Sequence, residues 1–199
     1  MSLAAMAFDP LYLFVFFGVF SPGPNVILLT ASGARFGVRR TVPHVIGVTL
    51  GVGVIAALSG LGIGALLKTV PALELALKIA AAIWILWMAW KLWTSTSATR
   101  TRDKDRPFTF IEAVLFQWVN PKAWAITLAA ATGFPSDLAP LAEAARLASA
   151  FSGINLFVCV FWSVAGSLLA YLLTTQTAWQ AFTRIMAALL ALSAAMVFL

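Results

Sequence analysis

Six long apolar segments alternate with short polar segments along the chain. An α-helix rises about 1.5 Å per residue, so about 20 apolar residues cross the roughly 30 Å hydrocarbon layer of a membrane. Each segment reaches or approaches this length, and the pattern therefore predicts six membrane-spanning helices. The predicted spans cover, approximately, residues 10–32, 42–67, 74–93, 108–134, 147–173 and 181–199.

The composition supports this interpretation. Of the 199 residues, 62% are hydrophobic and 10% are charged, and the mean hydropathy is +0.96. A soluble domain is typically about half apolar and about a quarter charged. We therefore predict an all-α integral membrane protein in the lipid bilayer of the cell (inner) membrane. Residues 1–9 carry no basic signal-peptide region, so we expect the first apolar segment to remain as a span.

Basic residues are unevenly distributed between the two sides of the predicted membrane. The net charge is +6, but these residues lie between apolar segments, so the charge does not indicate a nucleic-acid partner. Loops after the first, third and fifth spans hold Arg35, Arg39, Arg40, Lys91, Arg100, Arg102, Lys104, Arg106 and Arg184, whereas the opposite side holds Lys68, Lys78 and Arg146. The positive-inside rule places the larger set in the cytoplasm and both chain termini on the non-cytoplasmic side.

The first span is interrupted at its middle by Ser21-Pro22-Gly23-Pro24-Asn25. A proline lacks the backbone N–H and clashes with the preceding turn, so the helix must break or kink here. Backbone groups freed inside a membrane need protein or a polar cavity around them. We therefore take Pro22, Gly23, Pro24 and Asn25 as candidate substrate-binding residues, with a proline kink that serves only packing as the alternative.

The fourth span contains a matching interruption at Asn120-Pro121-Lys122. A polar linker at about residues 96–107 divides the chain into halves at about 8–95 and 108–199, within one transport domain. Each half has three spans, so the second half must run inverted relative to the first. Interrupted helices at corresponding positions of inverted repeats are the best sequence indication of a transporter site. Broken helix ends offer both donors and acceptors, which suits a zwitterion.

Lys122 lies deep in its predicted span, where an uncompensated charge costs on the order of 3 kcal/mol. We favour a functional role, either as a counter-ion for an anionic substrate group or as a lysine that exchanges protons. The alternative is a structural pairing with Glu112 or with a freed carbonyl. Asn155 in the fifth span either lines the cavity or bonds between helices.

Two further residues are candidates for proton coupling besides Lys122. Glu112 lies about one turn inside the cytoplasmic end of the fourth span, where it either carries protons or simply favours its helix N-terminus. His44 opens the second span at the same surface and either senses pH or is an interfacial polar residue. The single cysteine, Cys159, excludes an intramolecular disulfide and a cysteine-cluster metal site. We expect no cofactor and no metal.

The sequence resembles the LysE/RhtB family of amino-acid exporters over essentially its whole length. The resemblance rests on the break in the first span, on Gly37-Val38-Arg39-Arg40, on Gly47 and Gly51, and on Val119-Asn120-Pro121-Lys122-Ala123. It implies efflux of amino acids or close derivatives from the cytoplasm, driven by the proton gradient, with the two motifs at the site. Many family members carry an acidic residue near the glycines of the second span, where this chain has Gly51-Val52-Gly53-Val54. That departure shifts the expected proton coupling toward Lys122 or Glu112.

Other functions fit the sequence less well. A metal exporter would need clusters of carboxylates, histidines and cysteines that the spans lack. An intramembrane serine protease would need a Ser–His pair on facing helices, but His44 and Ser59 lie near opposite ends of one span. A scaffold would leave the paired breaks unexplained. An exporter of another small solute or cation remains the alternative, and the sequence leaves homo-oligomer formation open.

Overall fold

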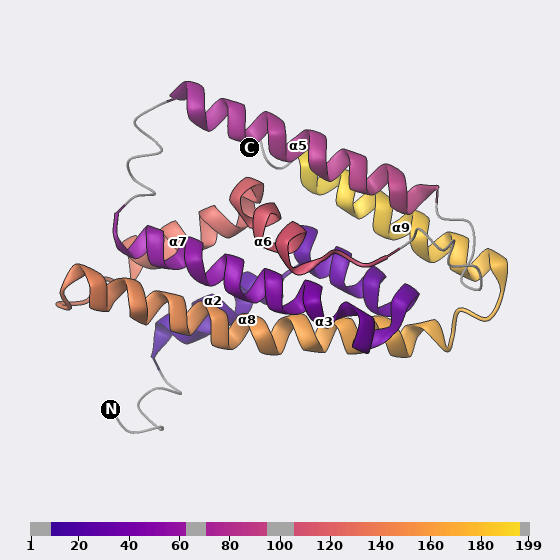
Figure 1. Cartoon of the computed structure of the whole chain (residues 1–199), viewed down its shortest axis with the longest axis horizontal. Helices are drawn as coiled ribbons and strands as arrows, with labels where there is room; N and C mark the ends of the chain where they lie inside the picture. The colour runs from indigo at the N-terminus through magenta and orange to yellow at the C-terminus, as the bar shows by residue number, and fades with distance from the viewer. Residues whose placement is uncertain (1–8, 63–70, 95–105, 196–199) are drawn as a thin grey trace.

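The computed structural model describes residues 9–62, 71–94 and 106–195, and within these ranges the fold is entirely helical (Figure 1). Most of the predicted linker, the loop at Lys68 and both chain ends lie outside the described residues. The helices are α2 (Pro10–Phe20), α3 (Pro24–Gly60), α5 (Pro71–Trp93), α6 (Phe110–Val119), α7 (Pro121–Gly133), α8 (Pro140–Ala170) and α9 (Gln176–Ala195). Of the described helices, α3, α8 and α9 are long and apolar enough to cross a membrane.

Both predicted helix breaks are present. The first span is divided into α2 and the start of α3, with Ser21, Pro22 and Gly23 between them. The fourth is divided into α6 and α7, and Asn120 is the only residue between those two helices. Proline occupies the first position of the helix after each break, where its missing N–H costs nothing.

The basic loop predicted between the first two spans is instead one sharp turn inside α3. Gly37 has φ 76° and ψ 164°, and the residues on both sides of it are helical. Such a positive φ is accessible to glycine but strained for other residues. The two arms fold back on each other, because the Ser32 and Thr41 hydroxyl oxygens lie 2.9 Å apart. The expected turn at the glycine is present, and it is tighter than a loop because one glycine suffices to reverse the chain.

Two more predicted boundaries need correction at the second half of the chain. The fifth span begins at Pro140, so the loop predicted at residues 135–146 is shorter than expected. Proline is favourable in the first turn of a helix, and Glu143 lies in that turn and pairs with Arg146 at 2.7 Å. The last helix begins at Gln176, inside the turn predicted at residues 174–180.

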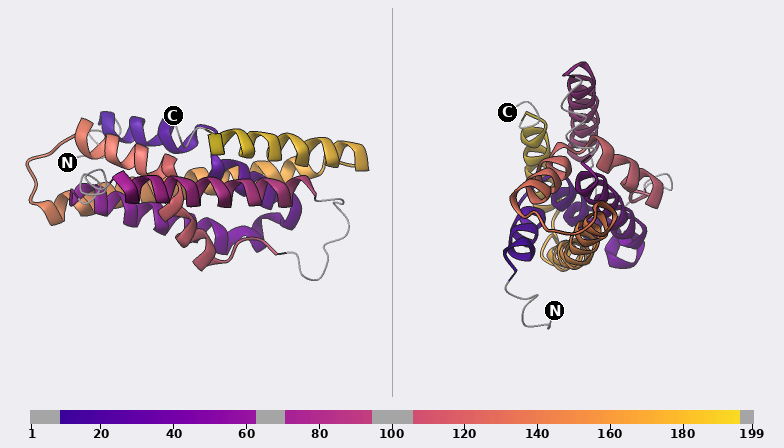
Figure 2. Two further views of the ribbon diagram at one scale, coloured as in Figure 1. Left: turned by 90° about the horizontal axis from the view of Figure 1, so that it is seen from above. Right: turned by 90° about the vertical axis from the view of Figure 1, so that its left-hand side faces the viewer.

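The second arm of α3 and the long helix α8 form the centre of the bundle, and α5 packs beside α9 (Figures 1 and 2). The backbones of α3 and α8 touch at two glycines. A side chain on Gly33 would overlap the carbonyl oxygen of Ser163, and one on Gly166 would overlap that of Thr30. Small residues therefore allow the close approach on which this helix pair depends.

Candidate functional site

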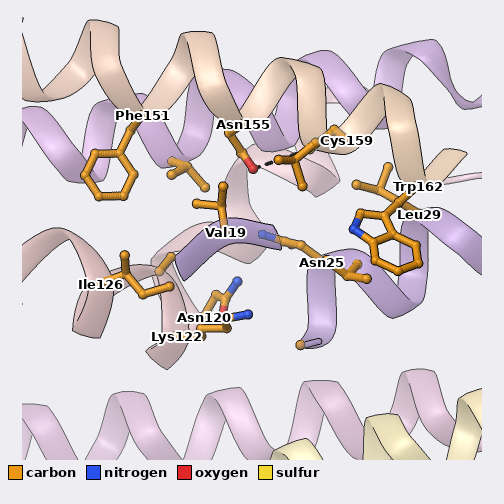
Figure 3. A pocket seen from close by; sticks show the side chains of 15 residues that line it. Val19, Asn25, Leu29, Asn120, Lys122, Ile126, Phe151, Asn155, Cys159 and Trp162 are labelled. Carbon is orange, nitrogen blue, oxygen red and sulfur yellow. Dashed lines mark hydrogen bonds between the residues drawn. The ribbon is translucent and has the colours of Figure 1, made fainter. Parts of the chain in front are cut away.

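A cavity lies where the two helix breaks meet α8 (Figure 3). Including its open mouth, the cavity contains about 460 Å³ of empty space. Its polar lining comes from both breaks, through Asn25, Asn120 and Lys122, and from α8, through Asn155 and Trp162. The structure therefore brings together residues that are far apart in the sequence and that the motifs identified separately. Gly23 also lines the cavity, whereas Pro22 and Pro121 shape the breaks beside it.

A group of three amides connects the two breaks. Asn25 and Gln117 exchange two hydrogen bonds, of 2.9 and 3.2 Å, and the amide nitrogen of Asn120 donates to Gln117 at 3.2 Å. Gln117 also donates to the carbonyl of Ala113 at 2.9 Å and is fully buried. Sequence reasoning missed Gln117. The available signal was an amide inside an apolar helix, one turn before Asn120.

Gln117→Leu is expected to destabilise the protein by about 1–3 kcal/mol, because it leaves Asn25 and Asn120 without a buried partner. The matched control is Gln180→Leu, which changes an amide on α9 that is not fully buried. Thermal unfolding of the purified protein in detergent measures both variants. Equal midpoints for the wild type and Gln117→Leu would show that the amide group contributes nothing to stability.

The Lys122 side chain extends from the first turn of α7 to the end of α2. Its ammonium donates to the backbone oxygen of Ser21, to the hydroxyl of Ser21 at 2.9 Å and to the carbonyl of Pro22 at 3.3 Å. The end of α2 carries a negative partial charge, which a cation stabilises. Gly23 leaves room for this path, because a side chain there would lie 2.7 Å from Cδ of Lys122. Of the two pairings considered for Lys122, the structure has the one with freed carbonyls.

The helices that leave the breaks begin without side-chain caps. Gly23 and Asn120 occupy the N-cap positions of α3 and α7, and neither gives a capping hydrogen bond. The outer ends differ, since Asp9 caps α2 and Thr109 caps α6 through their side chains. Uncapped N-termini present N–H groups with a positive partial charge, which is the environment that favours an anionic group.

Two buried amide atoms at the cavity lack partners within the described residues. They are Oδ1 of Asn120 and Nδ2 of Asn155, in side chains that are 2% and 3% exposed. The thiol of Cys159 lies 3.6 Å from the other amide atom of Asn155, its oxygen. A buried polar atom without a partner is costly in a folded protein. These atoms are therefore positioned to bind a ligand with both an acceptor and a donor.

Glu112 lies at the surface end of α6, away from the cavity. It accepts hydrogen bonds of 2.6 and 2.8 Å from Arg106 and forms a capping box with Thr109. The carboxylate raises the pKa of Arg106 above its ordinary value. This arrangement agrees with a carboxylate that stabilises its helix N-terminus, and it does not test whether Glu112 carries protons.

His44 is buried rather than interfacial, which corrects the sequence-based placement. Its side chain is 2% exposed, and its ring lies 5.0 Å from that of Phe108. The residue was placed at the surface because it follows the basic turn, but Phe108, from the start of the second half, covers it.

The serine considered as a protease partner of His44 lies elsewhere. The hydroxyl of Ser59 donates a hydrogen bond of 2.9 Å to Thr127. The structure therefore shows no Ser59–His44 pair.

Comparison with known proteins gives a family and several relatives. The LysE type translocator family matches residues 16–199. A cysteine/O-acetylserine efflux protein of Escherichia coli O1:K1 / APEC is 30% identical over 154 residues, which cover 74% of this chain and 76% of that protein. The protein of the same name in Salmonella paratyphi A is 28% identical over 171 residues, 83% and 85% of the two chains.

The chain belongs to the LysE type translocator family. An uncharacterized membrane protein of Pseudomonas aeruginosa is also similar, with 34% identity over 120 residues, which cover 55% of each chain. No solved structure gives a significant match. A LysE type translocator is a membrane transport protein and not an enzyme, in agreement with the sequence analysis. The family match extends over both breaks and over all the residues that line the cavity.

Proposed function

We propose that this LysE type translocator exports amino acids or close derivatives, and that the cavity between the two breaks binds them. The observation that carries the proposal is the convergence of two uncapped helix N-termini and two unpartnered amide atoms on one cavity. Hydrogen-bond donors and acceptors that lie around one cavity can bind both the carboxylate and the ammonium of a zwitterion. Lys122 is the only charged residue among the lining residues described, which argues against the alternative of a small cation.

In this proposal, the substrate carboxylate binds at the N-termini of α3 and α7, close to Pro24 and Pro121. Lys122 serves as its counter-ion by moving from the Ser21 and Pro22 carbonyls. The substrate ammonium donates to Oδ1 of Asn120. Asn25 donates to the side-chain oxygen of Gln117 and so helps to fix its position. The side-chain nitrogen of Asn120 donates to the same oxygen, which leaves Oδ1 of Asn120 directed away from Gln117.

The architecture supports transport by two inverted three-helix halves with alternating access. Helices of the first half pack against helices of the second: α2 against α7, α3 against α8, and α5 against α9. The turn of α3, the segment that leads into α6 and the C-terminal end of α5 lie at one end of the bundle (Figure 1). Arg184 of α9 also lies at this end, 5.6 Å from the centroid of the Trp93 ring. The surplus of basic residues there supports a cytoplasmic location for this end, with both termini on the other side.

Proton coupling belongs to the same proposal. Lys122 is the first candidate for the titrating group, because it is the charged residue at the cavity. Glu112 and His44 are further candidates, at the cytoplasmic half of the bundle. Exchange of a proton for the substrate would make the protein an antiporter.

Efflux from vesicles tests the proposal. The purified protein is reconstituted into vesicles preloaded with labelled alanine, serine, cysteine, O-acetylserine and lysine. At least one amino acid is expected to leave these vesicles several times faster than it leaves protein-free vesicles. Its efflux is expected to be faster still when the outside is acidic, because each proton that enters is exchanged for substrate that leaves. Equal rates with and without protein for every compound would reject amino-acid export, and insensitivity to the pH gradient would reject proton coupling.

A further inference from the structure

Three residues on α8 form a second polar edge of the cavity, separate from the helix ends. Asn155, Cys159 and Trp162 lie four and seven residues apart, so they share one face of the helix. Figure 3 shows all three directed into the cavity. Nε1 of Trp162 is buried and has no hydrogen-bond partner within the described residues, and Nδ2 of Asn155 is in the same condition. Both atoms are donors only.

The Trp162 ring is held in a fixed position beside the first break. Its centroid lies 5.2 Å from that of Phe20, the last residue of α2, and 5.5 Å from that of Phe161. The next residue, Ser163, contacts Gly33 through its backbone. The aromatic neighbours Phe20 and Phe161 limit how far the ring can turn its donor toward another protein group.

We infer that Trp162 and Asn155 form the subsite for the substrate side chain. The subsite selects small uncharged amino acids whose side chain carries a hydrogen-bond acceptor, such as a hydroxyl, ether or ester oxygen. This inference rests on the proposed export function. An aliphatic side chain of the same size would leave both buried donors unpaired, which disfavours it by roughly tenfold or more. A basic side chain would bring a second cation beside Lys122 in a cavity whose described lining has no carboxylate.

Two compounds that differ in one non-hydrogen atom test the selectivity. O-methylserine has an ether oxygen where norvaline has a methylene group. The full-length protein is reconstituted into vesicles that contain both compounds with different labels, and the ratio of their initial efflux rates is measured. The wild type is expected to favour O-methylserine by about tenfold, and Trp162→Phe is expected to lower that ratio at least threefold. Asn155→Leu is a second variant with the same expected direction.

Trp84→Phe is the matched control. Nε1 of Trp84 is also buried without a partner in the described structure, but this ring belongs to α5 and packs against Phe116 with 6.1 Å between centroids. It does not line the cavity. The control is therefore expected to keep the wild-type ratio, so that a change confined to Trp162→Phe reflects the subsite rather than the loss of any indole donor.

The outcomes separate the subsite from the export function. A wild-type ratio near one, or an unchanged ratio in Trp162→Phe and Asn155→Leu, would overturn the subsite. Export of alanine without export of either test compound would also overturn it and would leave the proposed function standing. If no amino acid leaves the vesicles faster than without protein, the proposed function itself is wrong.

Discussion

Lys122→Met is expected to abolish amino-acid export while the protein still folds and inserts. The ammonium is the charge at the cavity, and methionine keeps the length of the side chain without it. The substitution removes the hydrogen bonds of Lys122 to Ser21 and Pro22 and no other hydrogen bond within the described residues. Removal of a cation from a membrane span also makes insertion less costly. Efflux from vesicles, at equal amounts of folded protein, measures the effect.

Lys91→Met provides the control for loss of a positive charge. Lys91 lies on α5, and its ammonium is 3.8 Å from the centroid of the Trp87 ring, far from the lining of the cavity. This variant is expected to export at the wild-type rate. Efflux by Lys122→Met that equals the control would remove the lysine from the transport mechanism, whatever the substrate is.

The second large effect is expected at Gly166, where α8 touches α3. A valine side chain would overlap the backbone carbonyl of Thr30, and a backbone cannot move aside as a flexible side chain can. Overpacking of this kind costs about 1–3 kcal/mol or more. Gly166→Val is therefore expected to lower the yield of monodisperse protein severely and to reduce the unfolding temperature of the protein that remains.

Gly153→Val gives the comparison within the same helix. Gly153 is exposed on α8, and a side chain there would meet nothing within 4 Å. Both substitutions change helix propensity equally, so the difference between them isolates the contact with Thr30. Size-exclusion profiles and unfolding temperatures that match for the two variants would show that α3 and α8 are less tightly packed than the structure indicates.

The helix breaks were predictable because proline chemistry is local. Pro22, Pro24 and Pro121 each remove a donor and clash with the preceding turn, and each break concentrates this effect beside an asparagine or a glycine. The single Pro43, in contrast, is accommodated inside α3. The deep position of Lys122 likewise followed from counting residues in an apolar segment. The sequence could not decide between a substrate and a freed carbonyl as its partner, because that partner lies about one hundred residues earlier in the chain.

The rest of the site depends on contacts between distant segments. Gln117 was missed because only the fold places it between Asn25 and Asn120. Trp162 was one of eight tryptophans, and only its neighbours distinguish it from the others. His44 was misplaced for the same reason, since a remote phenylalanine covers it. Contacts between segments that are far apart in the chain cannot be predicted from hydrophobic periodicity or from composition.

The amide triangle of Asn25, Gln117 and Asn120 has a consequence for leakage. It joins the first half of the chain to the second with hydrogen bonds that are largely shielded from water. An empty carrier that changed its facing side would have to break these bonds with nothing to replace them. In the proposed mechanism, an amino acid in the cavity would supply donors and acceptors in their place, so the loaded form would change its facing side more easily than the empty one. If transport is coupled to protons as proposed, these hydrogen bonds would limit the leak of protons through a carrier that holds no substrate.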